Sequence, residues 1–439
     1  MSTPPSFPVR EARAYGGAFP KFAQPKELAC FSRNAQRLVT LDRSALRAYR
    51  VPRLPAVLDE GFESYVCRAS EAGEVASLAP VLDALAKRSV APAANSIITY
   101  RNNLNKIFLT PYQPRDDWEV GVERRTDGVI LLHVRDTARK IAEEARRDER
   151  GERMAYWGYR FEQLATLSDA EAAAYEAHAR AGGASGAARD ATSGVGYRIP
   201  SPSDPGSYDH LFPAHDLAAL RELYPGGGAA SSAPPTAGGA GAAAGQLPPV
   251  NANEEFCSVV QLSIDKVKLY MAAEIDCEAS SVPSGAAAAA PGAPVARGYV
   301  ELKTSKQLRD AREVEKFERY KLLKFWLQSF LADVPNIVVG FRDDAGHVRE
   351  LKTYETKTVH RLVRAPKNNG LGYWEPMVCF NFGKGVLEWC LQNMQAQPPG
   401  ERMVMRYDPA QAAVTLRPDV GAASGGAAED APSAKRPRV

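Results

Sequence analysis

The pattern of apolar and polar positions predicts a chain of mixed secondary structure. Apolar residues at helical spacing predict helices, at 32–49, 73–89, 137–167 and 307–332. Runs of alternating or β-branched apolar residues predict strands, at 96–112, 127–134, 256–264, 267–276, 298–304, 337–343 and 348–356. The strands 256–264 and 267–276 are expected to form one hairpin, which turns near Asp265, and 337–343 and 348–356 another. The stretch 377–394 reads as a strand that leads into a helix. We therefore expect an α/β (mixed α+β) fold with a central mixed sheet flanked by helices.

Three segments break this pattern and are rich in Ala, Gly and Pro, at 181–250, 280–298 and 419–439. Such segments bury too little apolar surface to offset the entropy of ordering them, so they are predicted to be disordered. The stretch 207–224 inside the first one carries apolar residues and is expected to dock or to form a short helix. These segments interrupt a single domain and do not separate two domains.

Charge and cysteine content narrow the class of protein. The formal net charge of the 439 residues is only +3, so a nucleic-acid partner would have to be held by local basic patches. Six cysteines without a CxxC pair fit reduced thiols. We find neither a signal peptide nor an apolar run long enough to span a membrane, and expect a soluble intracellular protein. Lys435, Arg436 and Arg438 form a basic tail, read either as a nuclear import signal or as a solubilising end; the protein is otherwise expected to be cytoplasmic.

Two short stretches, "AAEIDCE" at 272–278 and "GYVELKTS" at 298–305, carry the candidate chemistry. Side chains two apart in a strand share a face, so Glu274 pairs with Asp276, and Glu301 with Lys303. Carboxylates gathered on one face of adjacent strands are costly unless they are paired or bind a metal, and Mg²⁺ and Mn²⁺ prefer such oxygen ligands. Carboxylates and a lysine in this arrangement are typical of the D/E…(D/E)xK nuclease core. The alternative is an exposed polar face, because each pair is common by itself.

Two helices offer further candidates. Glu162 lies in "MAYWGYRFEQL" at 154–164, either as an inward metal ligand or as an exposed position beside an apolar stripe. Gly158 in that helix predicts a close approach of a neighbouring segment. Gln328 in "KFWLQSFLA" at 324–332 is either a buried amide or a contact to phosphate or water. The same helix has a basic run, which is either a solvated face or a track for a phosphate backbone, made of Arg312, Lys316, Arg319, Lys321 and Lys324.

Tyr100 and Arg101 in "TYRNNLNKI" place an aromatic ring beside a guanidinium. A base can stack on such a ring while the guanidinium contacts phosphate, as in sites for single-stranded nucleic acid. The dipeptide alone is weak evidence for such a site.

Several longer motifs occur together and in one order. They are "ELACFSRNAQR", "YRNNLNKIFLTPY", "MAYWGYRFEQ", "FCSVV", "AEIDC", "YVELKTSK", "KLLKFWLQSFLADVPNIVVGFRDDAG" and "VCFNF". In this order they resemble the decapping exoribonuclease (DXO-like) family, whose fungal members are partners of the nuclear 5′→3′ exoribonuclease. The resemblance covers about 18–415 and implies one decapping nuclease domain over that range.

The resemblance implies hydrolysis of RNA 5′ ends with two divalent cations, Mg²⁺ or Mn²⁺. It implies removal of pyrophosphate from 5′-triphosphate RNA, removal of incomplete or NAD caps, and 5′→3′ degradation, in RNA quality control. It assigns metal ligation to Glu162, Glu274, Asp276, Glu301 and the carbonyl of Leu302. It assigns contacts to the scissile phosphate and the attacking water to Lys303 and Gln328, with Glu274 also near substrate. It assigns further RNA contacts to Arg37, Tyr100, Arg101, Asn102 and Cys257.

Two other readings stay open beside this one. The first is a non-catalytic stabilising partner of the nuclear 5′→3′ exoribonuclease. The second is a DNA nuclease with the same acidic core. The intact set of Glu274, Asp276, Glu301 and Lys303 argues against a purely structural role.

Overall fold

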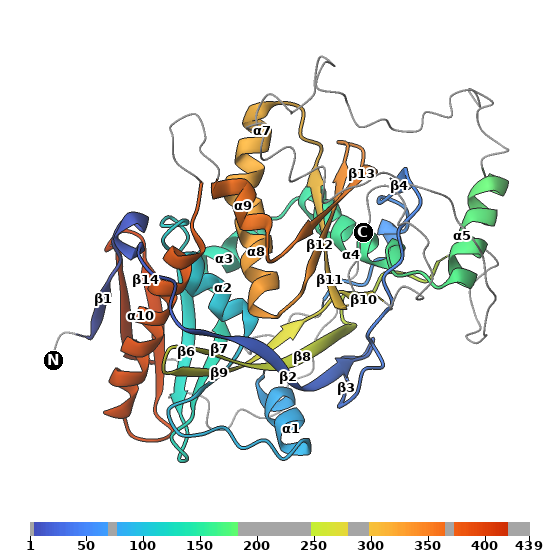
Figure 1. Cartoon of the computed structure of the whole chain (residues 1–439). Helices are drawn as coiled ribbons and strands as arrows, with labels where there is room; N and C mark the ends of the chain where they lie inside the picture. The colour runs from blue at the N-terminus through green and yellow to red at the C-terminus, as the bar shows by residue number, and fades with distance from the viewer. Residues whose placement is uncertain (1–3, 69–76, 183–246, 280–297, 365–372, 420–439) are drawn as a thin grey trace.

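Two β-sheets with helices packed between them form the framework of the computed structural model, which describes residues 4–68, 77–182, 247–279, 298–364 and 373–419 (Figure 1). The larger sheet has ten strands in the order β1-β15-β14-β6-β7-β5-β9-β8-β2-β3. Its strands are β1 (Ser6–Pro8), β2 (Phe22–Arg33), β3 (Val39–Thr40), β5 (Ile97–Tyr100), β6 (Trp118–Arg124), β7 (Ile130–Arg135), β8 (Glu255–Ile264), β9 (Val267–Glu274), β14 (Arg402–Asp408) and β15 (Ala413–Pro418).

The smaller sheet has five strands in the order β10-β11-β12-β13-β4. Strands β11 and β12 are parallel, and the other pairs in this sheet are antiparallel. The five strands are β4 (Ala56–Val57), β10 (Cys277–Ala279), β11 (Gly298–Lys306), β12 (Asn336–Arg342) and β13 (His347–Glu355).

Helices connect and cover these sheets. The α-helices of the described chain are α1 (Ala79–Lys87), α2 (Arg101–Leu109), α3 (Ala138–Ala145), α4 (Glu149–Leu164), α5 (Asp169–Gly182), α7 (Ala311–Lys316), α8 (Leu322–Leu331), α9 (Val359–Arg364) and α10 (Pro376–Gln395). Two short 3₁₀ turns occur, η1 (Ala12–Tyr15) and η2 (Phe62–Ser64), and a π-helical turn, η5 (Phe317–Lys321), joins α7 to α8.

The buried side chains show how these layers are stacked. The largest core lies between the two sheets and contains Phe108 of α2, Trp326 of α8 and Phe380 of α10. Helix α1 packs on the other face of the ten-stranded sheet, and α4 packs on the other face of the five-stranded sheet. Helices α2 and α8 therefore form a layer that separates the two sheets. A chain segment that runs from one sheet to the other must pass around the end of this helical layer.

Several sequence predictions are confirmed. The mixed α/β fold class is correct, although the strands divide between two sheets. The hairpin predicted at 256–276 forms as β8 and β9, with Asp265 in the turn at a left-handed φ of 50°. Strands β12 and β13 also pair as the predicted hairpin. The ten-stranded sheet extends beyond the predicted domain limits, because β1 pairs with the C-terminal strand β15.

Other predictions are wrong in ways that local sequence explains. Residues 32–49 form the end of β2, a turn and β3 instead of a helix. The predicted strand 96–112 is strand only to Tyr100 and then continues as α2, whose buried residues recur at helical spacing. The predicted helix 137–167 is two helices, because Asp148 caps a new one by accepting a hydrogen bond from the Gly151 N–H at 2.8 Å.

The C-terminal part differs as well. The stretch 377–394 is helical throughout as α10, and strands β6, β14 and β15 are not among the sequence predictions. Most of the three predicted disordered segments, including 207–224 and the basic tail, lies outside the described residues. At one boundary the prediction is wrong, since Val250 is buried in the core under α4.

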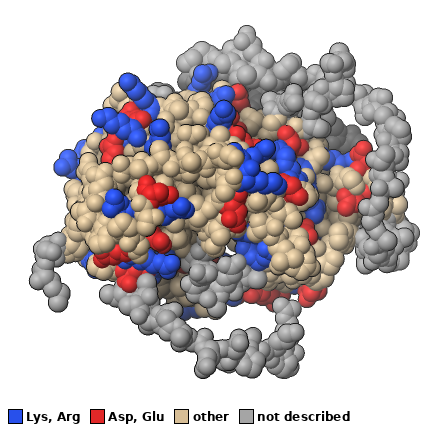
Figure 2. Space-filling model, turned by 90° about the horizontal axis from the view of Figure 1, so that it is seen from below, with Lys and Arg blue, Asp and Glu red and all other residues tan. Residues whose placement is uncertain are grey.

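Surface charge is evenly distributed on the face shown in Figure 2, where acidic and basic side chains are interspersed among the coloured residues. This agrees with the net charge of +3. All six cysteines carry free thiols. None of the helices in the described ranges is long and apolar enough to cross a membrane.

Two helical glycines give a matched test of this packing. A Cβ at Gly383 of α10 would lie 2.5 Å from the ring of Phe108, whereas a Cβ at Gly158 of α4 would meet nothing within 4 Å. We expect Gly383→Ala to lower the free energy of unfolding by about 1–3 kcal/mol through overpacking. We expect Gly158→Ala to raise it by about 0.5–1 kcal/mol through helix propensity. Urea unfolding of both variants checks this, and equal effects of the two would contradict the packing described.

Candidate active site

The acidic residues meet where the chain passes from one sheet to the other. Strand β9 ends at Glu274 in the ten-stranded sheet, and β10 begins at Cys277 in the five-stranded sheet, so Asp276 lies in the link between them. Strand β11, which carries Glu301, pairs with β10 and not with β9. The predicted arrangement, with both acidic pairs on one face of one sheet, is therefore wrong. The residues nevertheless converge, because the link brings the two sheets together at this point.

Glu301 is the centre of the cluster. Its side chain is fully buried, with 0% exposed. It accepts hydrogen bonds from the Lys303 ammonium and from Gln328 Nε2 at 2.5 Å, and Arg101 Nη1 lies 3.4 Å from its Oε2 atom. Burial alone would raise the pKa of Glu301, but the charges of Lys303 and Arg101 outweigh burial and lower this pKa. Glu301 is therefore an anion held by two cations and an amide.

Asp276 lies at the open edge of β11. It accepts a 2.6 Å hydrogen bond from the Leu302 N–H, and Lys303 Nζ is 3.7 Å away. Strand β10 covers β11 only as far as Val300. Since the N–H and C=O of one strand residue point to the same side, the Leu302 carbonyl also faces this edge. Burial, and then repulsion from Glu301, raise the pKa of Asp276 to about 7.

Helix α4 supplies Glu162 from the other face of the five-stranded sheet. The helix approaches β12 closely, because a Cβ at Gly340 would lie 2.9 Å from the ring of Phe161. The close approach predicted at Gly158 is wrong, and Gly340 provides it instead. Burial, and then the charge of Asp276, raise the pKa of Glu162 well above its ordinary value. Lys303 opposes this shift, and the pKa of Lys303 is itself raised because Glu301 and Asp276 outweigh its burial.

Glu274, with 41% of its side chain exposed, opens the cluster to solvent. It lines a cavity of about 340 Å³ together with Glu162, Asp276 and Tyr159. This volume lies at the small end of the range for small-molecule sites. Burial, and then the charge of Glu274, raise the pKa of Tyr159 to about 12, so this phenol stays neutral.

The structure places some of the implied substrate contacts inside the carboxylate cluster and others outside it. Arg101 belongs to the cluster: besides Glu301, it donates to the main-chain carbonyls of Glu274 at 2.9 Å and Gln328 at 3.3 Å. Tyr100 is 8% exposed and packs under α1, with its hydroxyl bonded to Arg33 and to the Ser77 carbonyl. The expectation that a base stacks on this ring is therefore wrong.

The remaining three implied contacts lie outside the carboxylate cluster. Cys257 is 2% exposed in β8, opposite Glu274, and burial and then Glu274 raise its pKa to about 12. A direct substrate contact by this thiol is inconsistent with its burial. Asn102 is exposed in the first turn of α2. Arg37 is half-buried in a turn with a φ of 61°, near enough to Tyr100 for its charge to affect that pKa.

Sequence reasoning missed a second ionic group beside the cavity. Glu255 is buried at the start of β8 and contacts Arg33 of β2 and Arg68. Arg68 also lies 3.7 Å from Glu274 Oε2, so it links this group to the carboxylate cluster. The signal in the sequence was a charged pair, Glu254 and Glu255, directly before an apolar strand.

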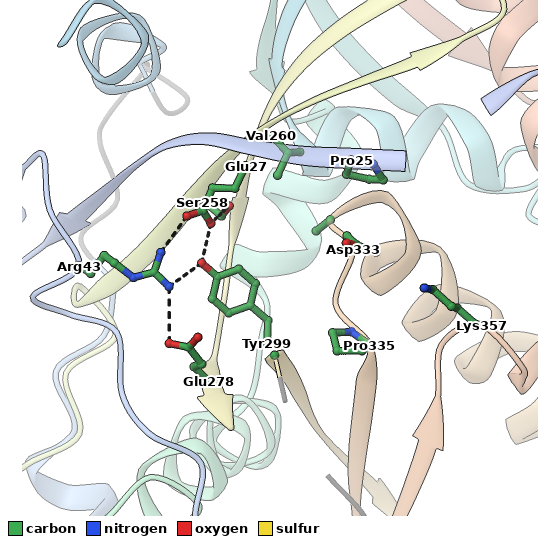
Figure 3. A pocket seen from close by; sticks show the side chains of 12 residues that line it. Pro25, Glu27, Arg43, Ser258, Val260, Glu278, Tyr299, Asp333, Pro335 and Lys357 are labelled. Carbon is green, nitrogen blue, oxygen red and sulfur yellow. Dashed lines mark hydrogen bonds and ion pairs between the residues drawn. The ribbon is translucent and has the colours of Figure 1, made fainter. Parts of the chain in front are cut away.

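A third network holds the two sheets together (Figure 3). Glu27 of β2 accepts hydrogen bonds from Ser258 and Tyr299, both at 2.5 Å, and from Arg43 at 2.8 Å. Arg43 also donates to the Tyr299 hydroxyl at 2.9 Å and lies 3.5 Å from Glu278. These residues border a separate cavity of about 450 Å³. Since Tyr299 is two residues from Glu301, and Glu278 two from Asp276, the network fixes β11, which carries Glu301, and β10, which directly follows Asp276.

The cluster suits a hard divalent cation in its chemistry. Its donors are carboxylates and a main-chain carbonyl, which Mg²⁺ and Mn²⁺ prefer. Burial, and then repulsion between carboxylates, raise the pKa values of Glu162 and Asp276 although Lys303 opposes both shifts, so a bound cation would stabilise their charged forms. Within the described ranges, no three His, Cys, Asp or Glu side chains already stand as a preformed metal cage. Glu301 is turned to Lys303 and Gln328, so we expect side-chain rearrangement on binding.

Comparisons with known proteins give one consistent family. The profile of the RAI1-like PD-(D/E)XK nucleases matches residues 23–186 and 232–429. The chain is 29% identical over 392 residues to the decapping nuclease RAI1 of Aspergillus fumigatus, which covers 88% of this chain and 86% of that protein. It is 28% identical over 415 residues to the human decapping and exoribonuclease protein, covering 92% of this chain and 84% of that protein.

A solved structure shows the same fold. Rai1 of Candida albicans in complex with pU5-Mn²⁺ superimposes with a TM-score of 0.65 at 21% identity, covering 96% of this chain and 94% of that one.

Stability measured with and without metal tests whether Glu162 is a metal ligand. In a chelator, we expect Glu162→Gln to raise the melting temperature by a few degrees, because the substitution removes an uncompensated buried charge. With Mn²⁺ at about 100 times its dissociation constant, the wild type should gain about 2.7 kcal/mol. The variant should gain less. Glu152→Gln, exposed on the same helix, is the control and should follow the wild type under both conditions. A variant that gains as much from Mn²⁺ as the wild type would exclude Glu162 as a ligand.

The pKa of Asp276 predicts how the metal-free protein responds to pH. Its folded-state pKa of about 7 exceeds the ordinary value of 3.8, so between these values the folded state binds more protons than the unfolded state. Stability should therefore fall as pH rises from 5 to 8, by an amount on the order of 2 kcal/mol. Chemical unfolding of the wild type and Asp276→Asn in a chelator measures this. The variant should show a flatter profile, and identical profiles would contradict the assignment.

Proposed function

Because the chain belongs to the RAI1-like PD-(D/E)XK nuclease family, we propose that it hydrolyses phosphoric anhydride and phosphodiester bonds at RNA 5′ ends. The proposed substrates are 5′-triphosphate RNA, RNA with incomplete or NAD caps, and 5′-monophosphate RNA that is degraded 5′→3′. The observation that carries this proposal is the convergence of four carboxylates, from Glu162, Glu274, Asp276 and Glu301, around Lys303, with three of them lining a cavity.

The relatives support this choice of substrate. The names of the Aspergillus and human proteins describe decapping, and the second also describes exoribonuclease activity. The Candida protein was solved with a short RNA and Mn²⁺. We therefore propose RNA and not duplex DNA as the substrate, since the names of these relatives describe decapping and exoribonuclease activity.

Two divalent cations, Mg²⁺ or Mn²⁺, are proposed for the cluster. Glu162, Glu274, Asp276, Glu301 and the Leu302 carbonyl are the groups that would hold them. When bound, such cations lower the pKa of water and stabilise charge on the attacking and leaving oxygens.

Three further groups of the chain orient the phosphate. Lys303 keeps its proton, because Glu301 and Asp276 raise its pKa, so it acts as a charged donor to phosphate oxygen and not as a base. Gln328 has an amide that is within reach of the same region, through its 2.5 Å bond to Glu301. Arg101 donates hydrogen bonds to Glu301 and to the main-chain carbonyls of Gln328 and Glu274, and so holds Glu301 in place.

The cavity of about 340 Å³ is proposed to receive the 5′-terminal group. Its arginines are paired with glutamates, Arg33 with Glu255 and Arg47 with Glu254, so the wall has polar groups without a large net positive charge. Such a wall suits a nucleoside or nicotinamide end better than a long polyanion.

We further propose action in the nucleus, supported by Lys435, Arg436 and Arg438 at the C-terminus. Association with the nuclear 5′→3′ exoribonuclease is proposed as an additional role, which the resemblance to fungal members supports.

The test is hydrolysis by the purified protein with Mg²⁺ or Mn²⁺. RNAs that carry a triphosphate, an unmethylated cap, an NAD cap or a monophosphate are offered to the wild type and to Glu274→Ala/Asp276→Ala. We expect the wild type to release pyrophosphate, cap dinucleotide, NAD or nucleotides, and the variant to lose at least about 100-fold in rate, since removal of electrostatic groups has effects of this size. Absence of hydrolysis by both proteins would overturn the proposal and favour a non-catalytic partner role.

A further inference from the structure

We propose that an exposed cationic strip beside the active site binds the RNA backbone downstream of the 5′ end. The strip consists of Tyr320, Lys321 and Lys324 of η5 and α8 with Arg342 at the end of β12. This inference rests on the proposed function, because it assigns a binding surface to the chain that follows the reacting phosphate. It decides between the two sequence readings of the basic helix, a solvated face or a phosphate track.

The strip begins at the catalytic cluster. Helix α8 lies along β11 and is joined to it at two points: Gln328 Nε2 contacts Glu301, and Lys321 Nζ donates to Ser305 Oγ at 3.1 Å. Positions 301, 303 and 305 share one face of the strand. Lys321, Lys324 and Gln328 follow at spacings of three and four, which places them on one side of the helix. The contact at Ser305 is therefore one step along the strand beyond Lys303.

The two lysines of the strip form no ion pair within the described part of the chain. Lys321 has Ser305 as its hydrogen-bond partner there, and Lys324 makes no ion pair. Both lysines are exposed. Burial, and then the charge of Arg342, lower the pKa of Lys321, which shows that the two cations are close enough to repel each other. A phosphate bound beside Lys321 would relieve this repulsion.

Arg342 is held in place on the α4 face of the five-stranded sheet. Its guanidinium lies over the ring of Trp157 of α4 at 4.3 Å and donates to the Asp343 carbonyl at 3.2 Å. Its buried Nε atom has no hydrogen-bond partner in the structure. Burial lowers the pKa of Arg342 most; among the nearby charges, Asp344 opposes this shift more strongly than Arg150 adds to it, and Asp343 also opposes it. An arginine held against an aromatic ring presents its guanidinium in a fixed orientation, which suits phosphate.

Tyr320 supplies an aromatic surface in the same strip. It is 48% exposed, although large apolar side chains are mostly buried in this protein. Arg319 lies 5.6 Å from the centre of its ring. Exposed rings among cations are the combination with which proteins hold single-stranded nucleic acid, since bases stack on the ring and cations contact the backbone. The π-helical turn that contains Tyr320 and Lys321 is also a feature often found at functional sites.

Charge distribution assigns the strip and the cavity to different parts of the substrate. The charged groups of the cavity wall are paired with one another, Arg33 with Glu255 and Arg47 with Glu254, so the wall offers few free cations to a run of phosphates. The strip is open and carries unpaired cations. The 5′-terminal group therefore enters the cavity, and the downstream chain follows α8 and β11.

The test compares RNA length and salt dependence in Lys321→Glu/Arg342→Glu and in the wild type. Binding of a labelled ten-nucleotide 5′-monophosphate RNA is measured by fluorescence anisotropy in Ca²⁺, which takes oxygen ligands. We expect the variant to bind about tenfold or more weakly, with the slope of log K against log salt reduced by about 1.4 for two lost phosphate contacts. Hydrolysis in Mn²⁺ should lose at least about tenfold more in kcat/KM on the decamer than on a dinucleotide. Tyr320→Ala should weaken binding without changing the salt slope.

Controls separate this proposal from misfolding and from failure of the proposed function. Lys26→Glu/Lys268→Glu makes the same charge change at exposed positions of β2 and β9 and should bind like the wild type. If Arg342→Glu disturbs folding, the single variant Lys321→Glu still tests the strip, because the residue it changes is exposed. It should also weaken RNA binding. Equal losses for the strip and control variants, or an unchanged salt slope, would overturn the inference. A wild type that binds the decamer through the strip but cleaves no 5′ end would instead overturn the proposed function.

Discussion

The ionic lattice around Glu301 is the constraint on which the rest of the site depends. A fully buried carboxylate costs several kcal/mol unless it is paired, and here the pairing comes from three different elements. Lys303 comes from the same strand, Arg101 from the start of α2 and Gln328 from α8. The lattice therefore fixes α2, α8 and β11 relative to one another. The position of any group on these elements that contacts substrate depends on it.

The negative charge of the carboxylate cluster is not fully balanced by the cations of the protein. Lys303 and Arg101 lie among the four carboxylates with Arg68 beside Glu274, and burial, together with repulsion among the carboxylates, raises the pKa values of Glu162 and Asp276. Such a cluster gains free energy from any further cation that reaches it. Function and stability are thus opposed in the metal-free protein, as expected for a site that concentrates charge for chemistry.

The two sheets explain how one chain offers a closed cavity and an open surface around a single site. The link through Asp276 joins the sheets, and the network of Glu27, Arg43 and Tyr299 holds them at a fixed separation. On one side of the link, the wall with Glu254 and Glu255 closes around a small volume. On the other side, β11 continues past β10 and leaves its edge open beside α8.

The sequence by itself determined the residue types of the site and much of the local structure. The spacing in "AEIDC" and "YVELKT", and the hairpins at β8–β9 and β12–β13, depend on neighbours in the chain, so local pattern predicts them. Tertiary structure decided the rest. It placed Glu274 and Glu301 in different sheets, buried Tyr100 and Cys257, brought Glu255 to Arg33 and Arg68, and used Gly340 instead of Gly158 for the close approach of α4. Those outcomes depend on contacts between residues far apart in the chain, which local periodicity does not encode.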